Sequence, residues 1–255
     1  MASDKFTVQS IRAMKSQGAK IAALTVYDFP LARLLDEVGI PLLLVGDSLG
    51  MVVLGYPDTT HVTMADMEHH VRAAARAKPR ALLGADLPYR SYETSEAAVA
   101  NARRLIEAGA EFVKLEGGRA VAKQVQALVA AGVPVCGHLG MLPQHVLEEG
   151  GYRIKGRNEV EHLALLADSD ALVQAGVFAI VLELVTPPVA GELTKRLPVP
   201  SIGIGSGPDC DGQILVTYDL LGMFPWFTPR HTKPAMNAAE QMALAARRWK
   251  ESLVS

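Results

Sequence analysis

Ionisable side chains stand at the ends of five successive apolar runs of the sequence. The runs, each with the side chain that follows or ends it, are 42–45 with Asp47, 81–83 with Asp86, 112–115 with Glu116, 133–136 with His138, and 178–182 with Glu183. Carboxylates gathered at one place repel one another, and a divalent cation bound among them is the simplest way to neutralise this repulsion. Two carboxylates, waters and substrate oxygens suit Mg²⁺. The pattern therefore predicts a magnesium site wherever these ends meet.

Lys114 and Glu183 suggest more specific chemistry. Lys114 and Glu116 are two residues apart in one predicted strand, so their side chains share a face. A buried lysine needs a partner; it could neutralise a substrate carboxylate or a developing enolate, or serve only as a structural ion pair. Glu183 lies in the most apolar context, where an unpaired acid is costly, so we interpret it as functional.

Each remaining side chain also has a purely structural interpretation. Asp47 precedes Ser48 and could close a turn, and the same holds for Asp86 before its Leu-Pro pair. Glu116 precedes two glycines and could bind a helix N-terminus. His138, as a single histidine, fits a core position as well as a ligand. The joint placement favours function, since five coincidences at strand ends are rarer than one shared site.

The apolar runs alternate with alanine-rich amphipathic segments, and these are the elements that must position the acids. Near-continuous apolar runs indicate parallel strands buried on both faces. The predicted strands are 21–26, 41–45, 81–83, 112–115, 133–136, 178–182 and 200–204, with 214–216 as candidate for the eighth. The predicted helices include 63–77, 94–109, 119–131 and 159–175. This alternation alone fits a closed barrel or an open doubly wound sheet.

Length and composition indicate one globular domain. The 255 residues suit a single α/β barrel, and no linker divides them, so we predict one domain over 1–255. We expect an extra helix at 7–15 under the barrel, a terminal helix at 237–254 and a functional loop at 150–157. Hydrophobic residues make up 49% and charged residues 20%, which predicts a large core.

Charge, cysteines and apolar segments exclude several classes of protein. The net charge of −2 gives no basic excess for nucleic acid or an anionic membrane. Cys136 and Cys210 are too few for a disulfide framework. No apolar segment follows residues 1–5, and the longest apolar stretch, 40–45, cannot span a bilayer. The glycine-rich segment 203–207 matches neither standard nucleotide motif. We expect a cytoplasmic protein that binds small molecules.

Ordered motifs along nearly the whole chain resemble those of the ketopantoate hydroxymethyltransferase (3-methyl-2-oxobutanoate hydroxymethyltransferase) family. The similar stretches are 25–28, 45–51, 62–66, 85–88, 113–118, 134–140, 150–152, 203–207 and 211–216. Some positions depart from the family pattern. Met141 and Leu142 stand where Leu-Thr is usual, Leu184 stands where Cys is common, and the chain diverges after Gly222.

The resemblance implies a fold, a reaction and a set of site residues. The fold is a (β/α)8 TIM barrel of the phosphoenolpyruvate/pyruvate type, usually assembled as a homodecamer. The reaction is transfer of a hydroxymethyl group from 5,10-methylenetetrahydrofolate to 3-methyl-2-oxobutanoate, which gives 2-dehydropantoate for pantothenate and coenzyme A synthesis. The implied roles are Asp47, Asp86 and Glu116 at Mg²⁺, Asp47, Ser48, Asp86, Lys114 and His138 at the substrate, and Glu183 as proton acceptor.

Two alternatives remain at this point. One is an isocitrate-lyase-like or phosphoenolpyruvate-mutase-like lyase on the same barrel, which would carry a reactive cysteine on a mobile loop. Cys136 within a predicted strand and Cys210 in a late loop disfavour it. The other is a non-catalytic barrel that senses a keto acid or a folate. Such a binder has no need of a base, Glu183, beside a metal site.

Overall fold

The computed structural model of the protein describes residues 4–227, 229–230 and 232–253. The chain divides into two compact units, 1–214 and 215–255, and each is described by itself. Among the residues described, none of the helices combines the length and the apolar composition that a membrane span requires. Residues 1–3, which formed part of the N-terminal segment considered above, lie outside the described residues.

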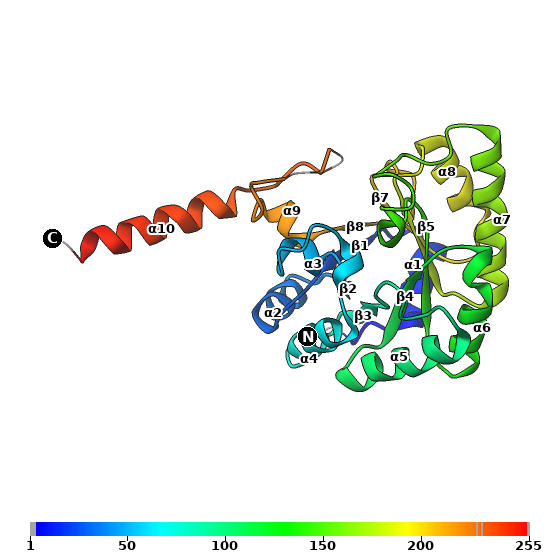
Figure 1. Ribbon diagram of the computed structural model, residues 1–255, viewed down its shortest axis with the longest axis horizontal. Coiled ribbons are helices and arrows are strands. Elements are labelled where there is room, and N and C mark those ends of the chain that lie inside the picture. Colours follow the sequence, from blue (N-terminus) through cyan, green and yellow to red (C-terminus); the bar gives the residue numbers. More distant parts are fainter. Residues whose placement is uncertain (1–3, 228, 231, 254–255) are drawn as a thin grey trace. The chain divides into compact units, whose positions relative to one another are not determined.

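Within the described residues, eight parallel strands close into a barrel in their order along the chain (Figure 1). The strands are β1 Ile21–Thr25, β2 Leu42–Val45, β3 Leu82–Asp86, β4 Phe112–Glu116, β5 Val135–Gly140, β6 Ala179–Glu183, β7 Ser201–Ile204 and β8 Gly212–Leu215. The predicted strands are confirmed, and the eighth begins two residues earlier than 214–216. Closure decides against the open doubly wound sheet that the alternation also allowed.

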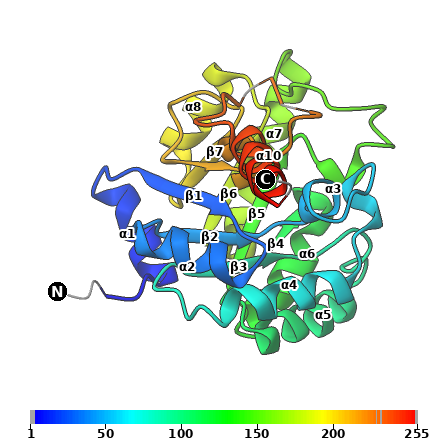
Figure 2. The same ribbon diagram turned by 90° about the vertical axis from the view of Figure 1, so that its left-hand side faces the viewer.

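Helices surround the strands, and their ends follow capping signals in the sequence (Figure 2). The helices of the first unit are α1 Val8–Ser16, α2 Phe29–Glu37, α3 Leu49–Val52, α4 Met64–Ala75, α5 Ser95–Ala108, α6 Ala122–Ala130, α7 Glu159–Ala175 and α8 Pro187–Arg196, with the 3-10 turns η1 Thr59–His61, η2 Arg119–Val121 and η3 Pro143–His145. At α4, Thr63 and Asp66 bond reciprocally through side chain and backbone. α7 ends at Gly176, whose φ of 100° suits glycine.

Helix α1 closes the end of the barrel where the strands begin. Ile11 of α1 is fully buried in the core cluster, which includes Phe112 and Phe178 from two strand starts. Those two rings meet edge to face with centroids 5.2 Å apart, a preferred aromatic geometry. Burial of one such isoleucine side chain contributes about 1.5–3 kcal/mol. The helix predicted at 7–15 is thus confirmed, with Thr7 as its N-cap.

The second unit contains α9 Thr217–Leu221 and α10 Ala238–Ser252. Asn237 caps α10 by accepting a hydrogen bond from the backbone N–H of Glu240. The terminal helix predicted at 237–254 is therefore confirmed over its described part, while Val254 lies outside the described residues. Within α10, Met242 and Trp249 are exposed.

Candidate active site

The strand register of the barrel places the predicted site residues beside one another. Asp86 on β3 pairs in register with Lys114 on β4, and Glu116 on β4 pairs with His138 on β5. Gly140 on β5 pairs with Glu183 on β6. Because all these strands run parallel, their carboxyl ends meet at one end of the barrel, which is where barrels position chemical groups. The sequence prediction that these ends converge is confirmed.

Lys114 is a buried cation between an acid and a histidine. Its Nζ lies 3.1 Å from Oδ1 of Asp86 and 3.2 Å from Nδ1 of His138. Burial opposes its charge, but the carboxylates of Asp86 and Glu116 outweigh burial and raise the lysine pKa. Lys114 therefore carries a fixed positive charge at the centre of the acids.

His138 lies between two acids from neighbouring strands. Its Nδ1 is 3.4 Å from Oε1 of Glu116, and its Nε2 is 3.3 Å from Oε2 of Glu183. Burial and Lys114 favour the neutral ring, yet the two acids raise the pKa of His138 to about 9. In the charged ring, and equally in the neutral ring that accepts from Lys114 at Nδ1, Nε2 carries a hydrogen. Nε2 lies 3.3 Å from Oε2 of Glu183 but forms no hydrogen bond in the described part of the chain.

Asp47 lies two residues beyond β2 and bends back over the neighbouring strand end. Its backbone N–H donates to Oδ2 of Asp86 at 3.0 Å, and its own Oδ2 accepts from the Gln144 amide at 2.8 Å. Burial raises the pKa of Asp47 well above its ordinary value, and the charges of Asp86 and Glu116 add to this. The fold thus holds Asp47 where its negative charge is unfavourable without a compensating cation.

The chemistry of the donor atoms fits a divalent cation. Oδ1 of Asp86 and Oε1 of Glu116 are buried without a hydrogen-bond partner. Each lies within ion-pair distance of a basic side chain, Lys114 for Asp86 and His138 for Glu116. Across the described residues, no group of three or more His, Cys, Asp and Glu side chains is arranged to hold a metal ion. Mg²⁺ does not need such a cage, because it usually takes one or two carboxylates and keeps several waters.

Ser48, the remaining predicted substrate contact, follows Asp47 directly and precedes α3. Its hydroxyl shares a 2.9 Å hydrogen bond with the hydroxyl of Tyr27, which is itself 1% exposed. The backbone carbonyl of Tyr27 in turn lies 2.6 Å from Nδ1 of His70. The serine is thereby fixed next to the acids but does not bond to any of them in these contacts.

Sequence reasoning assigned no role to Gln144 and Tyr92, which the structure adds to this group. Gln144 lies in η3 and is 1% exposed, and Tyr92 follows β3 and is also buried. Their side chains meet in a 2.6 Å hydrogen bond from the Tyr92 hydroxyl to the Gln144 amide oxygen. A buried glutamine is unusual without hydrogen-bond partners. In the sequence, the one local indication of this residue was a polar side chain directly after the apolar stretch that ends at Pro143.

The positions that depart from the family pattern lie close to the site. Met141 is fully buried, and its sulfur lies 3.4 Å from the backbone nitrogen of Arg153 in the 150–157 loop. Leu184, directly after Glu183, has a φ of 48°, which is unusual outside glycine. Its backbone N–H donates to Ile204 and its carbonyl accepts from Lys155. These bonds hold the unusual backbone in place.

Both cysteines are buried and reduced. Cys136 lies in β5, where burial raises the pKa of its thiol to about 12. Cys210 precedes β8, and burial raises its pKa as well. A thiol with a raised pKa is a poor nucleophile at neutral pH. Neither cysteine matches the reactive loop thiol that the lyase alternative requires.

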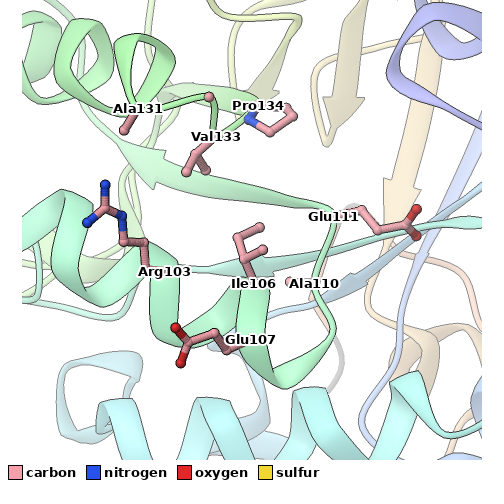
Figure 3. Close-up of a pocket in the computed structure, with 9 residues that line it drawn as sticks. Arg103, Ile106, Glu107, Ala110, Glu111, Ala131, Val133 and Pro134 are labelled. Atoms are coloured by element: carbon pink, nitrogen blue, oxygen red, sulfur yellow. The ribbon is translucent and has the colours of Figure 1, made fainter.

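Figure 3 shows a separate cavity and the side chains that line it. It measures about 500 Å³ and is lined by residues from the end of α5 and from the connections that follow α5 and α6. Arg103, Glu107 and Glu111 are its charged side chains. None of the strand-end acids lines it, so its position does not support a role in the same chemistry.

Solved structures similar to this chain share its fold. A 2,3-dimethylmalate lyase described as a PEP mutase/isocitrate lyase superfamily member matches with a TM-score of 0.66 and 18% identity, over 96% of this chain and 87% of that chain. A phosphoenolpyruvate phosphomutase from Streptomyces platensis subsp. rosaceus matches with a TM-score of 0.65 and 15% identity, over 86% of this chain and 84% of that chain. At these identities the likeness concerns the fold alone, and it agrees with the closed (β/α)8 barrel described above.

Sequence comparison identifies the family. The family model described as ketopantoate hydroxymethyltransferase matches residues 5–255. The 3-methyl-2-oxobutanoate hydroxymethyltransferase of Moorella thermoacetica is 52% identical over 98% of this chain and 93% of its own length. The enzyme of the same name from Ignicoccus hospitalis is 50% identical over 98% of this chain and 95% of its own length. With its barrel and strand-end acids, the chain therefore belongs to the ketopantoate hydroxymethyltransferase family.

Proposed function

We propose that this hydroxymethyltransferase removes the C3 proton of 3-methyl-2-oxobutanoate with Glu183 as base, in a site that holds Mg²⁺. The activity itself, hydroxymethyl transfer to 3-methyl-2-oxobutanoate, follows from family membership and from relatives about half identical over nearly the whole chain. That activity implies 5,10-methylenetetrahydrofolate as the second substrate. The metal and the roles of individual residues are the parts that we add.

One observation carries the assignment of Glu183 as the base. Among the strand-end acids, the Glu183 side chain keeps 12% exposure, whereas Asp86 and Glu116 keep 3% and 1%. One Glu183 oxygen faces His138, which leaves the other to receive a proton. A base must reach the proton that it removes, and such a base typically contributes about 10²–10⁴-fold to the rate.

The remaining groups stabilise the charge that develops. Asp47 and Asp86 would hold Mg²⁺ directly, with Glu116 at the ion through water. When bound, the ion acts as a Lewis acid toward the keto oxygen and carboxylate of the substrate. Lys114 and His138 supply positive charge and hydrogen-bond donors fixed before the substrate binds. Ser48 contacts the substrate from the start of α3.

The carbon–carbon bond then forms between the two substrates. The enolate carbon attacks the one-carbon unit that the folate carries as an iminium. The bond from that carbon to the folate nitrogen then breaks, a water supplies the oxygen of the new hydroxymethyl group, and tetrahydrofolate leaves with a proton from that water on its nitrogen. Holding both reactants together contributes much of the remaining acceleration. No side chain needs to form a covalent bond in this scheme, which agrees with the two buried, unreactive cysteines.

The 150–157 loop is proposed to shield this reaction from bulk water. Lys155 pairs with Val185, just beyond Glu183, in an isolated bridge. The Tyr152 hydroxyl lies 3.9 Å from the Met51 sulfur, and burial together with Glu183 raises its pKa. Both observations support a loop that lies over the site. Protease cleavage of this loop should slow when both substrates bind, and unchanged cleavage would count against the role.

The family resemblance also leads us to propose a cytoplasmic homodecamer without nucleic-acid or membrane partners. Exposed Met242 and Trp249 on α10 support a further protein contact. Sedimentation at several protein concentrations tests the assembly. A monomer at all concentrations would exclude it.

Proton exchange at C3 tests the proposed function. The C3–H signal of 3-methyl-2-oxobutanoate is followed by proton NMR in D₂O with the protein and Mg²⁺, and again with EDTA. We expect exchange that EDTA abolishes and that Glu183→Gln slows by at least about 10²-fold. The control is Glu192→Gln on α8, an acid that pairs with His162, which should exchange like the wild type.

Two outcomes would contradict the proposal. Exchange that is unchanged in Glu183→Gln would remove this residue as base. Absence of exchange both without and with 5,10-methylenetetrahydrofolate would overturn the enolate route and favour a keto-acid or folate sensor. Exchange that appears only with the folate would keep the route and make it folate-gated.

A further inference from the structure

Gln144 connects acids that belong to different strands. Its side-chain nitrogen donates to Oδ2 of Asp47 at 2.8 Å and to the backbone carbonyl of Leu87 at 2.9 Å. Both amide hydrogens are thereby used. Because Oδ2 of Asp47 receives this bond, the amide determines which oxygen of that carboxylate turns toward Gln144 and which turns away.

Tyr92 fixes the orientation of this amide. The Tyr92 hydroxyl donates to the Gln144 side-chain oxygen at 2.6 Å, and it accepts a longer bond, 3.4 Å, from the backbone N–H of Glu116. A flipped amide would place its oxygen against the Asp47 carboxylate and the Leu87 carbonyl, which are both acceptors. These two acceptors select the orientation in which every polar atom of the glutamine side chain is bonded, and the tyrosine stabilises it by donating to the amide oxygen.

The backbone of Gln144 holds a second acid. Its N–H donates to Oε2 of Glu116 at 3.0 Å, while Oε1 of the same carboxylate faces Nδ1 of His138 at 3.4 Å. One residue in the connection after β5 thus contacts Asp47 beyond β2 and Glu116 at the end of β4. These are two of the three acids that the proposed function assigns to Mg²⁺.

A purely space-filling role does not require these contacts. Burying an amide is unfavourable unless its hydrogen bonds are replaced, and an apolar side chain of similar length would fill the space without that cost. Here the amide hydrogens go to a carboxylate and a carbonyl at strand ends rather than to the barrel core. The bonds thus serve the orientation of the acids.

We propose that Gln144 is a positioning residue, which sets the carboxylates of Asp47 and Glu116 for the metal before it binds, with Tyr92 holding the amide in its working orientation. The inference rests on the proposed function, because that function assigns the two acids to Mg²⁺. Partners that orient metal ligands typically change metal affinity by about 10–100-fold when removed.

Metal binding in the absence of substrates tests the inference. Mn²⁺ serves as a spectroscopic substitute for Mg²⁺, and its dissociation constant is measured by electron paramagnetic resonance for the wild type, Gln144→Met and Tyr92→Phe. We expect Gln144→Met to weaken binding about 10–100-fold. Tyr92→Phe keeps the glutamine but frees its amide, so it should weaken binding in the same direction and by less. In steady-state kinetics, kcat should fall while the KM for the folate stays near that of the wild type.

Thr194→Val is the control for a general loss of stability. Thr194 is buried near the strand starts, where its hydroxyl bonds to Ala190 and Ser201. This variant should melt at a lower temperature and still bind Mn²⁺ like the wild type. If Gln144→Met does not fold, Tyr92→Phe retains the amide and still reports on its orientation.

The outcomes separate this inference from the function on which it rests. Wild-type Mn²⁺ affinity in Gln144→Met, or in Tyr92→Phe when Gln144→Met does not fold, overturns the positioning role and leaves the metal site intact. A wild-type protein that binds neither Mn²⁺ nor Mg²⁺ overturns the metal site itself, and the positioning role with it. Weakened binding in both variants, with Thr194→Val unchanged, supports the role.

Discussion

Nε2 of His138 lies 3.3 Å from Oε2 of Glu183. The histidine thus lies beside the proposed base on one side, and through Nδ1 it also contacts Glu116 on the neighbouring strand. The ring lies between the two acids, and it contacts only one of the two carboxylate oxygens of Glu183. A single buried imidazole therefore links the base to the acids proposed to hold the metal.

Replacement of this ring should destabilise the protein and slow exchange. His138→Leu removes the group that compensates the buried Glu116 and the partly buried Glu183, and breaking a buried charge pair typically costs about 3–5 kcal/mol. We expect a loss of that order in the free energy of unfolding, measured by urea denaturation, together with slower C3 proton exchange. His162→Leu on α7, whose partner Glu192 is half exposed, is the control. An equal loss of unfolding free energy in both variants would contradict the argument that His138 compensates the acids of the site.

Asp47→Asn and Glu116→Gln should change stability in opposite directions. Burial, Asp86 and Glu116 raise the pKa of Asp47, so its neutral amide should stabilise the metal-free protein. Burial opposes the charge of Glu116, but His138 outweighs it and lowers the pKa of Glu116, so its amide should destabilise. Urea denaturation in EDTA measures both changes in the free energy of unfolding, and a change of the same sign in the two variants would contradict the charge argument.

Magnesium should reverse the stability order of the wild type and Asp47→Asn. At 100 times the dissociation constant, Mg²⁺ should stabilise the wild type by about 2.7 kcal/mol, whereas Asp47→Asn should gain little. Melting temperatures with Mg²⁺ and with EDTA measure both effects. A metal-free Asp47→Asn that melts below the wild type would contradict the charge argument.

Gly140→Ala should disturb the strand that carries Glu183. Gly140 has a φ of 96°, and an added Cβ would lie 2.1 Å from the carbonyl oxygen of Glu183. We expect a loss of more than about 2 kcal/mol in stability and slower proton exchange. Gly39→Ala is the matched control, because Gly39 has a φ of 83° with nothing within 4 Å of the added carbon. If Gly39→Ala slowed exchange equally, backbone strain alone would explain the result.

Asp219 should make stability depend on pH below neutrality. Burial raises its pKa to about 6 from an ordinary 3.8, so the folded protein binds this proton more tightly than the unfolded chain. Below pH 3.8 the side chain is protonated in both states and does not lower the free energy of unfolding. Between pH 3.8 and about 6 this free energy falls as the pH rises, and above about 6 the loss is complete. Asp219→Asn should therefore stabilise the protein at pH 7 by up to about 3 kcal/mol, and not at pH 3.5. Urea denaturation at both pH values measures the free energy of unfolding. A gain for Asp219→Asn that is equal at pH 7 and pH 3.5 would show that ionisation of Asp219 is not its cause.

Strands, helices and the convergence of the acids were predictable because they depend on local pattern. Continuous apolar runs marked strands buried on both faces, and Thr63 and Gly176 marked helix ends that the structure confirms. Parallel strands then bring their carboxyl ends together without further information. His138 differs slightly, since it lies within β5, which continues to Gly140.

The network around Gln144 was not predictable in the same way. Its contact with Asp47 joins residues 97 positions apart, and that with Tyr92 joins residues 52 apart. Such contacts depend on the packing of connections between strands, which carry no periodic signal. The single domain over 1–255, the three metal ligands, the substrate contacts, the decamer and the cytoplasmic location stay predictions.

The packing of α1 under the barrel has a consequence for the order of events. Because Ile11 and the core cluster fill the end where the strands begin, a molecule can reach the acids only from the opposite end. The keto acid and the folate must therefore share one route of approach. A closed barrel floor thus makes the two substrates compete for one entrance, and the substrate that lies deeper has to enter first.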